Sequence, residues 1–509
     1  MTVPSGSSAS DTREPSALTI VLLLAAARLL FHLVTNSNYG FHRDELAVVD
    51  DARRLAWGYV AYPPFTPFIA RIALEIFGTS LAGLRLFSSL AQCIAMVVAA
   101  LMVREMGGGR FAQILSAIAT AIAPMSLVMS AMFQYIAFDY LWWVLVAYLI
   151  VRIIRTGEAK LWVAVGLVIG LGMLTKYTMA FLALSVATAV LLSPLRRFLR
   201  SGWLWLGVAV SLLVFLPNLI WQVQHDFISL RFLSSIHERD VDIGRTDGFL
   251  SMQLFVSANP FTLPIWLAGL WHVLVSQHGR PWRPVGFLYL FALMLFLVAE
   301  GRFYYLAPAY PMLFAAGSLR MEMWLGGMPE RRVLFMKGMT AVLMIAGTLF
   351  GSVLMLPLAP INSPLWNFRS GIHDNFSEQI GWQELTHTVA TIHRSLPPPK
   401  VPTAVLTGNY GEAGAINLYG PALDLPQAIS GINSYWYLGY GAVAPQRVII
   451  LGYSPADATR IFHDCRMAGE ITNRFGVENE ETRFHREIFV CGEPKIPWSE
   501  LWPRLQSFG

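Results

Sequence analysis

The sequence predicts a polytopic α-helical membrane protein that ends in a small soluble α/β domain, and three observations support this class. Of the 509 residues, 55% are hydrophobic and only 14% are charged, which lies outside the usual range of soluble proteins. Apolar runs of roughly the 20 residues that a bilayer requires recur before residue 357. After Pro357 the composition becomes mixed and polar, with proline clusters, which indicates a domain boundary.

The first apolar run, residues 17–34, is not followed by a small-residue cleavage site, so we expect a retained membrane span. Further runs bring the expected number to about eleven. They lie at 80–103, 112–131, 139–154, 161–175, 177–193, 203–221, 260–276, 284–299, 306–319 and 333–357.

Lysine and arginine gather in alternate loops between these runs. Short cytoplasmic loops retain positive charge during insertion, so these loops and the N-terminus are predicted to be cytoplasmic. The opposite side then receives segments 35–79, 222–259 and 301–305 and everything after 357. The cytoplasmic set is Arg104, Arg110, Arg152, Arg155, Lys160, Arg196, Arg197, Arg200, Arg280, Arg283, Arg320, Arg331 and Arg332.

The region 358–509 has the pattern of a soluble extracytoplasmic α/β unit. Segments 401–409, 446–453 and 486–494 are expected to form strands, and 455–471 an amphipathic helix. This region holds 11 Lys and Arg against 14 Asp and Glu, and 11 − 14 = −3. The net charge of +5 therefore comes from the membrane part, and nucleic-acid binding loses support.

Two of the three cysteines, Cys465 and Cys491, belong to the region predicted outside the cytoplasm, whereas Cys93 lies within a span. A disulfide between the first two is expected. Two unpaired buried thiols remain the alternative, because sequence does not give the Cα separation. The sequence indicates no certain cofactor and leaves a divalent metal open.

The segment 35–79 is the richest in charge among the predicted outer loops. Residues 44–58 have helical periodicity, which predicts an amphipathic helix lying along the membrane interface. The apolar stripe of this helix consists of Leu46, Val49, Ala52 and Leu55.

Asp44 and Glu45 open this expected helix. Capping explains both carboxylates, since the helix dipole stabilises an acidic first turn. The functional interpretation is a general base beside a cationic partner, His42 or Arg43, and both of these residues are expected to contact substrate. From spacing alone the two interpretations carry equal weight.

Other polar residues lie at predicted outer ends of spans. Asp139 is surrounded by aromatic and apolar residues, where an acid is costly unless it faces a cavity or a partner, although an inert interfacial position is the alternative. Lys176 interrupts an apolar stretch, and it either extends to the interface or binds an anion such as lipid phosphate. Arg302 is disfavoured on this side and has the geometry to bind phosphate, whereas an aromatic belt also explains Tyr304 and Tyr305.

Five motifs occur in the order of a known family: RDEL, RRLAWGYVAYPPFTPFIARI, LTKYT, GRFYYLAPAYP and NYGEAGAINLYG. With these motifs the chain resembles bacterial members of the dolichyl-phosphate-mannose protein mannosyltransferase superfamily, which includes the aminoarabinose transferases of lipid A modification. The resemblance implies a GT-C fold in the bacterial inner membrane. It also implies a sugar donor linked to polyprenyl phosphate and an envelope lipid, glycan or protein as acceptor.

By position, the resemblance assigns Asp44 as catalytic base, with Glu45 beside it and Asp139 as a second acid. Lys176, Arg302 and one of the following tyrosines would hold the donor phosphate. The expected reaction is direct displacement at the anomeric carbon, with inversion.

Two features remain outside these assignments. Relatives commonly place His or Lys directly before the paired prolines, where this chain has Tyr62, so a cationic contact is missing. Tyr62 can still hydrogen-bond and is expected to contact substrate. The segment TGNYGEAGA lacks the Lys-Ser/Thr ending of a phosphate loop, and we interpret it as structural or acceptor-facing. The polar candidates for acceptor contact in and near this segment are Glu412, Asn417 and Asn433.

A transporter or lipid flippase is the alternative class, because many spans with charged residues also suit a substrate pathway. No internal repeat relates the two halves of the chain, and the polar residues gather on one membrane face. Both features favour the transferase. A third candidate is an inactive scaffold that presents the C-terminal domain.

Overall fold

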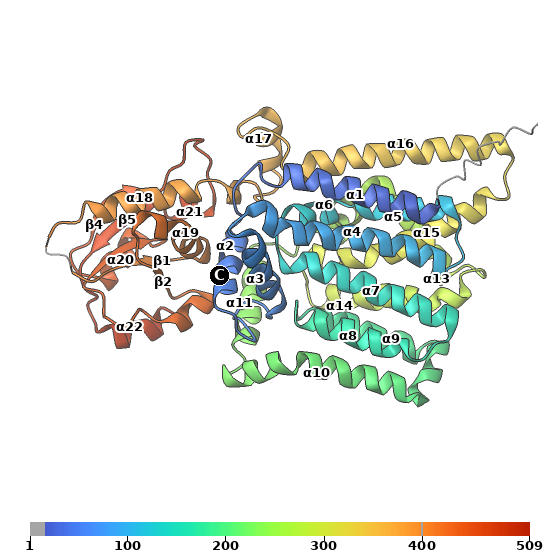
Figure 1. Ribbon diagram of the computed structural model, residues 1–509, viewed down its shortest axis with the longest axis horizontal. Coiled ribbons are helices and arrows are strands. Elements are labelled where there is room, and N and C mark those ends of the chain that lie inside the picture. Colours follow the sequence, from blue (N-terminus) through green and yellow to red (C-terminus); the bar gives the residue numbers. More distant parts are fainter. Residues whose placement is uncertain (1–15, 399–400) are drawn as a thin grey trace, which may run out of the picture.

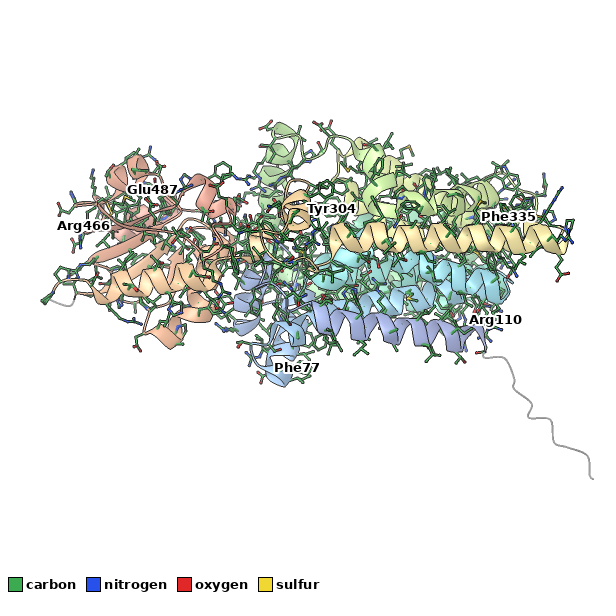
Figure 2. All side chains as sticks on the ribbon, turned by 90° about the horizontal axis from the view of Figure 1, so that it is seen from above. Phe77, Arg110, Tyr304, Phe335, Arg466 and Glu487 are labelled. Carbon is green, nitrogen blue, oxygen red and sulfur yellow. A yellow bond between two sulfur atoms is a disulfide. The ribbon has the colours of Figure 1, made fainter. Side chains whose placement is uncertain are left out.

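The computed structural model describes residues 16–398 and 401–509. Figure 1 shows a large helical part joined to a smaller part of mixed helices and strands, with most long helices running along the long axis of the molecule. In Figure 2, Arg110 and Phe335 lie at the far end of the helical part, whereas Tyr304 lies at the end that meets the α/β part. The polar junction and the basic end of the bundle are therefore at opposite ends.

Six helices among the described residues are long and apolar enough to cross a membrane. They are α1 (Ala17–Thr35), α4 (Leu81–Glu105), α7 (Tyr135–Thr156), α10 (Gly202–Gln224), α14 (Arg283–Val298, extended by the turn 280–282) and α16 (Glu330–Met355). Among them α4 and α7 are the most buried, whereas α1, α10 and α16 expose most of their apolar surface. The exposed apolar surface suits contact with lipid.

Three bent pairs raise the number of candidate spans to nine. A proline begins the second member of each pair, at Pro124, Pro194 or Pro260, because proline lacks the N–H that would continue the helix. The pairs are α5 (Arg110–Ala121) with α6 (Pro124–Ala131), α9 (Met179–Leu191) with η1 (Pro194–Arg200), and α12 and η2 (Phe249–Met252, Gln253–Ala258) with η3 and α13 (Pro260–Thr262, Leu263–Leu274).

The expected number of about eleven spans exceeds these nine. The difference corresponds to α8 (Leu161–Met173) and α15 (Tyr310–Leu325), which have 13 and 16 residues and are shorter than a full bilayer crossing. By length and composition, the structure therefore has six to nine candidate spans among the described residues.

Glycine pairs bring several helices into close contact. A Cβ at Gly166 of α8 would collide with the carbonyl of Gly207 on α10, and one at Gly269 of α13 would collide with the backbone of α15 near Gly317. Without a hydrophobic driving force between helices in lipid, close packing of small residues holds such pairs together.

The C-terminal part contains a five-stranded mixed sheet in the order β2-β1-β3-β5-β4. Strand β1 pairs in parallel with β2 and β3, and β5 pairs antiparallel with β3 and β4. The strands are β1 (Thr403–Thr407), β2 (Ala428–Ser430), β3 (Arg447–Leu451), β4 (Arg466–Glu470) and β5 (Glu487–Cys491). The helices are α17 (Pro364–Ser370), α18 (Trp382–Arg394), α19 (Tyr410–Tyr419), α20 (Pro455–Ile461), α21 (Glu480–Phe484) and α22 (Trp498–Arg504), with short 3-10 turns between them.

The helix expected over 455–471 is wrong in its second half. Only α20 is helical, and the residues of β4 pair with β5 instead. The helix ends at Phe462, whose backbone is extended, and Asp464 then has a left-handed backbone with φ 52°. The neighbouring Cys465 is joined to Cys491 of β5 in a disulfide. Tertiary pairing therefore overrides the helical periodicity.

Replacing both Cys465 and Cys491 by Ser should lower the free energy of unfolding of the α/β part by about 3 kcal/mol, since the disulfide closes a loop with a sequence separation of 26. The measurement is thermal unfolding of the detergent-solubilised chain with and without reductant. Reductant should destabilise the wild type and leave the double variant unchanged. An equal response of both proteins to reductant would contradict the prediction.

The expected interfacial helix is present as α2 (Arg43–Arg53), but its surroundings differ from the expectation. It packs between α3 (Phe65–Phe77) and α19 of the α/β part, at the junction seen in Figure 1. Leu46, Val49 and Ala52 are buried, as their spacing predicts, whereas Leu55 lies beyond the helix and is exposed. The α/β part therefore packs against a helix that was expected to lie along the membrane interface.

Candidate active site at the junction of the two parts

Asp44 and Glu45 diverge at the first turn of α2, because neighbouring residues of a helix point about 100° apart. His42 caps this turn, since its Nδ1 accepts from the Asp44 N–H at 3.2 Å and its own N–H donates to Glu45 Oε2 at 2.8 Å. Helix capping thus operates as the sequence suggested, but it uses His42 and Glu45. Asp44 is left for a different role.

Glu45 is fully buried and forms an ion pair with Arg85, which donates to both carboxylate oxygens at 2.7 Å. The backbone N–H of Phe133 donates to the same carboxylate, also at 2.7 Å. Both oxygens are therefore occupied, whereas Glu45 was expected to take part in catalysis. These contacts tie α2 to α4 and to the chain before α7, so they favour a positioning role for Glu45.

Asp44 remains 37% exposed and is held by two donors. Gln134, the N-cap residue of α7, donates to Oδ2 at 2.5 Å, and the Tyr410 hydroxyl of α19 donates to Oδ1 at 2.9 Å. One side chain comes from the membrane part and the other from the α/β part. The carboxylate is thus oriented but accessible, as a general base requires.

Arg43 contacts the α/β part and reaches Asp44 only through the hydroxyl of Tyr410, whereas it was expected to bind substrate beside the base. It forms ion pairs with Glu480 and Glu378, and its Nε donates to the Tyr410 hydroxyl at 3.0 Å. Burial raises the pKa of Glu378 to about 8. Arg43 therefore connects the two parts of the protein.

Lys176 lies in an aromatic enclosure between α8 and α9. Its Nζ is 3.6 Å from the ring centroid of Tyr305 and 5.7 Å from those of Tyr135 and Tyr304. The side chain is buried, and among the described residues no carboxylate lies within ion-pair distance of it. A buried cation of this kind is suited to an anionic ligand.

Asp139, one turn into α7 from Tyr135, is buried, and its Oδ1 has no hydrogen-bond partner among the described residues. It lies near enough to Lys176 for electrostatic interaction. At the start of α7, Gln134 contacts Asp44, whereas Tyr135 and Asp139 lie near Lys176. Helix α7 therefore forms one wall that both parts of the site share.

Arg302 lies at the same end of the bundle and is paired with Asp240 of α11 (Ile228–Asp242). Its Nε donates to Asp240 Oδ2 at 2.5 Å, and Nη1 donates to the Tyr304 hydroxyl at 2.9 Å. A phosphate bound by Arg302 would have to share this arginine with Asp240. The contact with Asp240 was not predicted from the sequence. The acidic run HERDVD in the predicted outer segment was the signal that could have indicated an acidic partner for Arg302.

Tyr62 borders the site through its ring, whose centroid is 5.9 Å from that of Tyr135. Its hydroxyl donates to Asp51 Oδ2 at 2.6 Å. Burial raises the pKa of Asp51 to about 7. The hydroxyl of Tyr62 is thus committed to Asp51 in this structure, whereas its expected role was contact with substrate.

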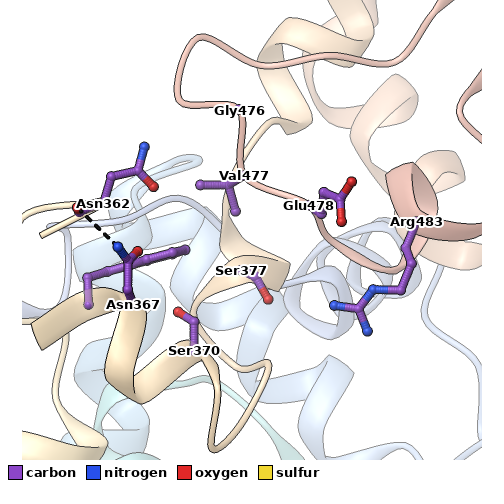
Figure 3. Close-up of a pocket in the computed structure, with 9 residues that line it drawn as sticks. Asn362, Asn367, Ser370, Ser377, Gly476, Val477, Glu478 and Arg483 are labelled. Carbon is purple, nitrogen blue, oxygen red and sulfur yellow. Dashed lines mark hydrogen bonds between the residues drawn. The ribbon is translucent and has the colours of Figure 1, made fainter. Parts of the chain in front are cut away.

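Two pockets lie elsewhere in the structure, and neither is lined by Asp44, Lys176 or Arg302. One of about 600 Å³ lies between the ends of α11 and α14 and adjoins the Arg302 segment, with Phe249, Phe296 and Glu300 in its lining. The second, of about 350 Å³, is polar and lies between α17 and the loop that precedes α21, as Figure 3 shows with Ser370, Glu478 and Arg483 around it. Across the described residues, no three His, Cys, Asp or Glu side chains gather in a way that would hold a metal.

The remaining candidates lie on α19 and near β2. Asn417 Nδ2 donates to Asp50 Oδ2 of α2 at 2.7 Å, and Glu412 Oε2 accepts from the Gly408 N–H at 3.2 Å. Asn433 Nδ2 donates to the Gly509 carbonyl at 3.0 Å. These contacts are internal to the protein and favour the structural interpretation of all three residues.

Comparison with known proteins identifies the class of this fold. The crystal structure of ArnT from Cupriavidus metallidurans bound to undecaprenyl phosphate matches 93% of this chain and 98% of its own, with a TM-score of 0.59 and 16% identity. Arabinofuranosyltransferase AftD from Mycobacteria matches 93% of this chain and 41% of its own, with a TM-score of 0.51 and 13% identity. The chain has the fold of the GT-C superfamily of membrane glycosyltransferases.

The sequence comparisons narrow the class further. Residues 61–221 match the model of the family described as dolichyl-phosphate-mannose-protein mannosyltransferase. Lipid A galacturonosyltransferase RgtD from Rhizobium johnstonii is 28% identical over 243 residues, which are 46% of this chain and 50% of that protein. The match thus spans about half the length of this curated relative. The superfamily resemblance seen in the sequence motifs is confirmed.

Proposed function

We propose that the protein is an inverting glycosyltransferase that moves a sugar from a polyprenyl-phosphate donor to an envelope lipid, glycan or protein. One observation carries the proposal: the accessible, doubly oriented carboxylate of Asp44 and the buried cation Lys176 lie next to consecutive residues at the start of α7, Gln134 and Tyr135. A base and an anion site so arranged fit a displacement in which a proton is removed on one side and a phosphate leaves on the other.

The reaction proceeds in one displacement. Asp44 takes the proton of an acceptor hydroxyl or amine as the acceptor atom forms its bond to the anomeric carbon. The bond between that carbon and the phosphate oxygen breaks on the opposite face, which inverts the stereochemistry. Lys176 and Arg302 stabilise the charge that develops on the lipid phosphate, and this matters more in a site with little water.

The relatives support this donor and one class of acceptor. The ArnT structure contains undecaprenyl phosphate, and RgtD is described as acting on lipid A. We propose the same chemical classes of donor and acceptor for this chain, with membrane lipids surrounding the helical bundle. A divalent metal is left open.

The proposal also covers topology. Counting α8 and α15 with the nine candidate spans gives 9 + 2 = 11 spans. Residues 1–357 form the catalytic membrane domain, residues 358–509 form an extracytoplasmic domain, and the N-terminus is cytoplasmic in the bacterial inner membrane. The basic end marked by Arg110 in Figure 2, opposite the site, supports this orientation.

The deciding experiment measures sugar transfer from radiolabelled polyprenyl-phosphate sugars by the purified protein in lipid nanodiscs, with extracted envelope lipids and glycans as acceptors. Labelled product is expected from the wild type. Movement of intact donor across the bilayer without labelled product would support a flippase, and the absence of both would support an inactive scaffold.

Replacing Lys176 by Met should weaken the binding of polyprenyl phosphate by at least about 10-fold, because a charge-assisted contact to phosphate is lost while the apolar stem still fills the aromatic enclosure. Binding is measured by competition of unlabelled polyprenyl phosphate with the donor. The control is Lys160→Met, which removes a lysine from an exposed loop of the bundle. Equal inhibition constants in both variants would contradict the assignment of Lys176.

A further inference from the structure

The segment NYGEAGA (409–415) forms the start of α19, which packs closely on α2. Two glycines make this contact. A Cβ at Gly414 would approach the backbone carbon of Leu46 to 2.8 Å, and one at Gly411 would approach the Cβ of Arg43 to 3.0 Å. Because any larger residue would push the helices apart, these glycines set the distance between the α/β domain and Asp44.

Asn409 caps the helix by accepting from the Glu412 N–H at 2.9 Å, which fixes the direction in which the first turn presents Tyr410. The hydroxyl of Tyr410 accepts from Arg43 Nε at 3.0 Å and donates to Asp44 Oδ1 at 2.9 Å. The Arg43 guanidinium also lies 4.7 Å from the centre of the Tyr410 ring. Since Arg43 can only donate, the single proton of the hydroxyl is directed to Asp44.

We propose that Tyr410 is a positioning residue of the reaction centre, so that the C-terminal domain completes the transferase site instead of being only attached to it. The inference rests on the proposed function of Asp44. The hydroxyls of the sugar or lipid acceptor would reach Asp44 from the exposed side that Tyr410 and Gln134 leave open.

The physical effect of Tyr410 is twofold. Donors on the two different oxygens of Asp44 fix the plane of its carboxylate, and a donor to a carboxylate stabilises the ionised form, which is the form that accepts a proton. The other titratable groups beside Asp44 are His42 on α2 and Tyr135 on α7, and neither depends on the hydroxyl of Tyr410. Arg43 loses one hydrogen bond when that hydroxyl is removed, but it keeps its ion pairs with Glu480 and Glu378.

The test is Tyr410→Phe, which removes only the hydroxyl, compared with Tyr419→Phe on the same helix. We expect Tyr410→Phe to lower kcat about 10-fold and to move the acidic limb of the pH profile of kcat up by about one pH unit. The KM for donor should stay unchanged. Tyr419→Phe should match the wild type in all three quantities.

The position of the pH limb does not depend on the amount of folded enzyme, so partial unfolding of the variant cannot imitate the expected result. A Tyr410→Phe enzyme with the pH profile of the wild type would overturn the inference while leaving the proposed function intact, whether or not its melting temperature falls. Absence of sugar transfer by the wild type would instead overturn both.

Discussion

Replacing Asp44 by Asn is expected to lower the turnover number for sugar transfer by about 10³-fold, which is within the range that general-base catalysis supplies. The amide retains the shape of the carboxylate and can still accept from Gln134 or Tyr410, but it cannot take a proton from the acceptor. The KM for donor should change little, because Asp44 does not contact the leaving phosphate in the proposed mechanism. Transfer rates are measured at saturating donor.

The matched control is Asp242→Asn, an exposed acid near the end of α11, which should retain the activity of the wild type. Both variants should elute as monodisperse protein with similar melting temperatures. Turnover by Asp44→Asn within about threefold of the wild type would exclude Asp44 as the base and direct attention to Asp139, the buried acid near Lys176.

Replacing Arg85 by Met is expected to lower the free energy of unfolding by about 3–5 kcal/mol, because it leaves the carboxylate of Glu45 buried without a counter-charge. Arg85 and Glu45 are both fully buried. Arg85 also donates to the Asn36 carbonyl at 2.5 Å and to Gln379 Oε1 at 3.1 Å, so the loss extends to three chain segments. Stability is measured by thermal unfolding in detergent.

The double variant Glu45→Gln with Arg85→Met should recover much of this loss, since no uncompensated charge remains. As a surface control, Arg71→Met removes the exposed pair of Arg71 with Glu75 and should cost less than about 1 kcal/mol. If the double variant recovers stability and still transfers sugar, Glu45 acts by positioning, as the structure indicates. A stable double variant without measurable transfer would restore Glu45 as a catalytic candidate.

The spans were predictable because bilayer thickness imposes a length and a composition on every crossing, and both can be seen in one sequence. Every apolar run singled out from the sequence contains or overlaps a helix, including α8 and α15. The number of spans was less certain, since the bends at Pro124, Pro194 and Pro260 divide runs that hydropathy treats as continuous. Strand β4 was missed because its pairing with β5 is a non-local interaction without a local periodicity.

The site was predictable in part. Charged residues in apolar stretches or at outer span ends are costly, and this cost pointed to Asp139, Lys176 and Arg302. Asp44 was singled out by its place in a charged outer segment and by the family resemblance. Their partners Gln134, Tyr410 and Asp240 were missed, because an uncharged amide or phenol carries no such cost and Asp240 lies in the polar run HERDVD at the end of α11. Residues 44 and 410 are 366 positions apart, and no pattern along the chain relates them.

Sequence by itself determined the class of this protein, the placement of its apolar helices and the end of the bundle at which charged residues gather, because these follow from local hydropathy and charge. Tertiary structure alone decided that Glu45 pairs with Arg85, that Arg43 turns into the C-terminal domain, and that Asp44 is the carboxylate left accessible. The reason is that two adjacent carboxylates in a sequence are equivalent until the packing of other segments neutralises one of them and leaves the other exposed.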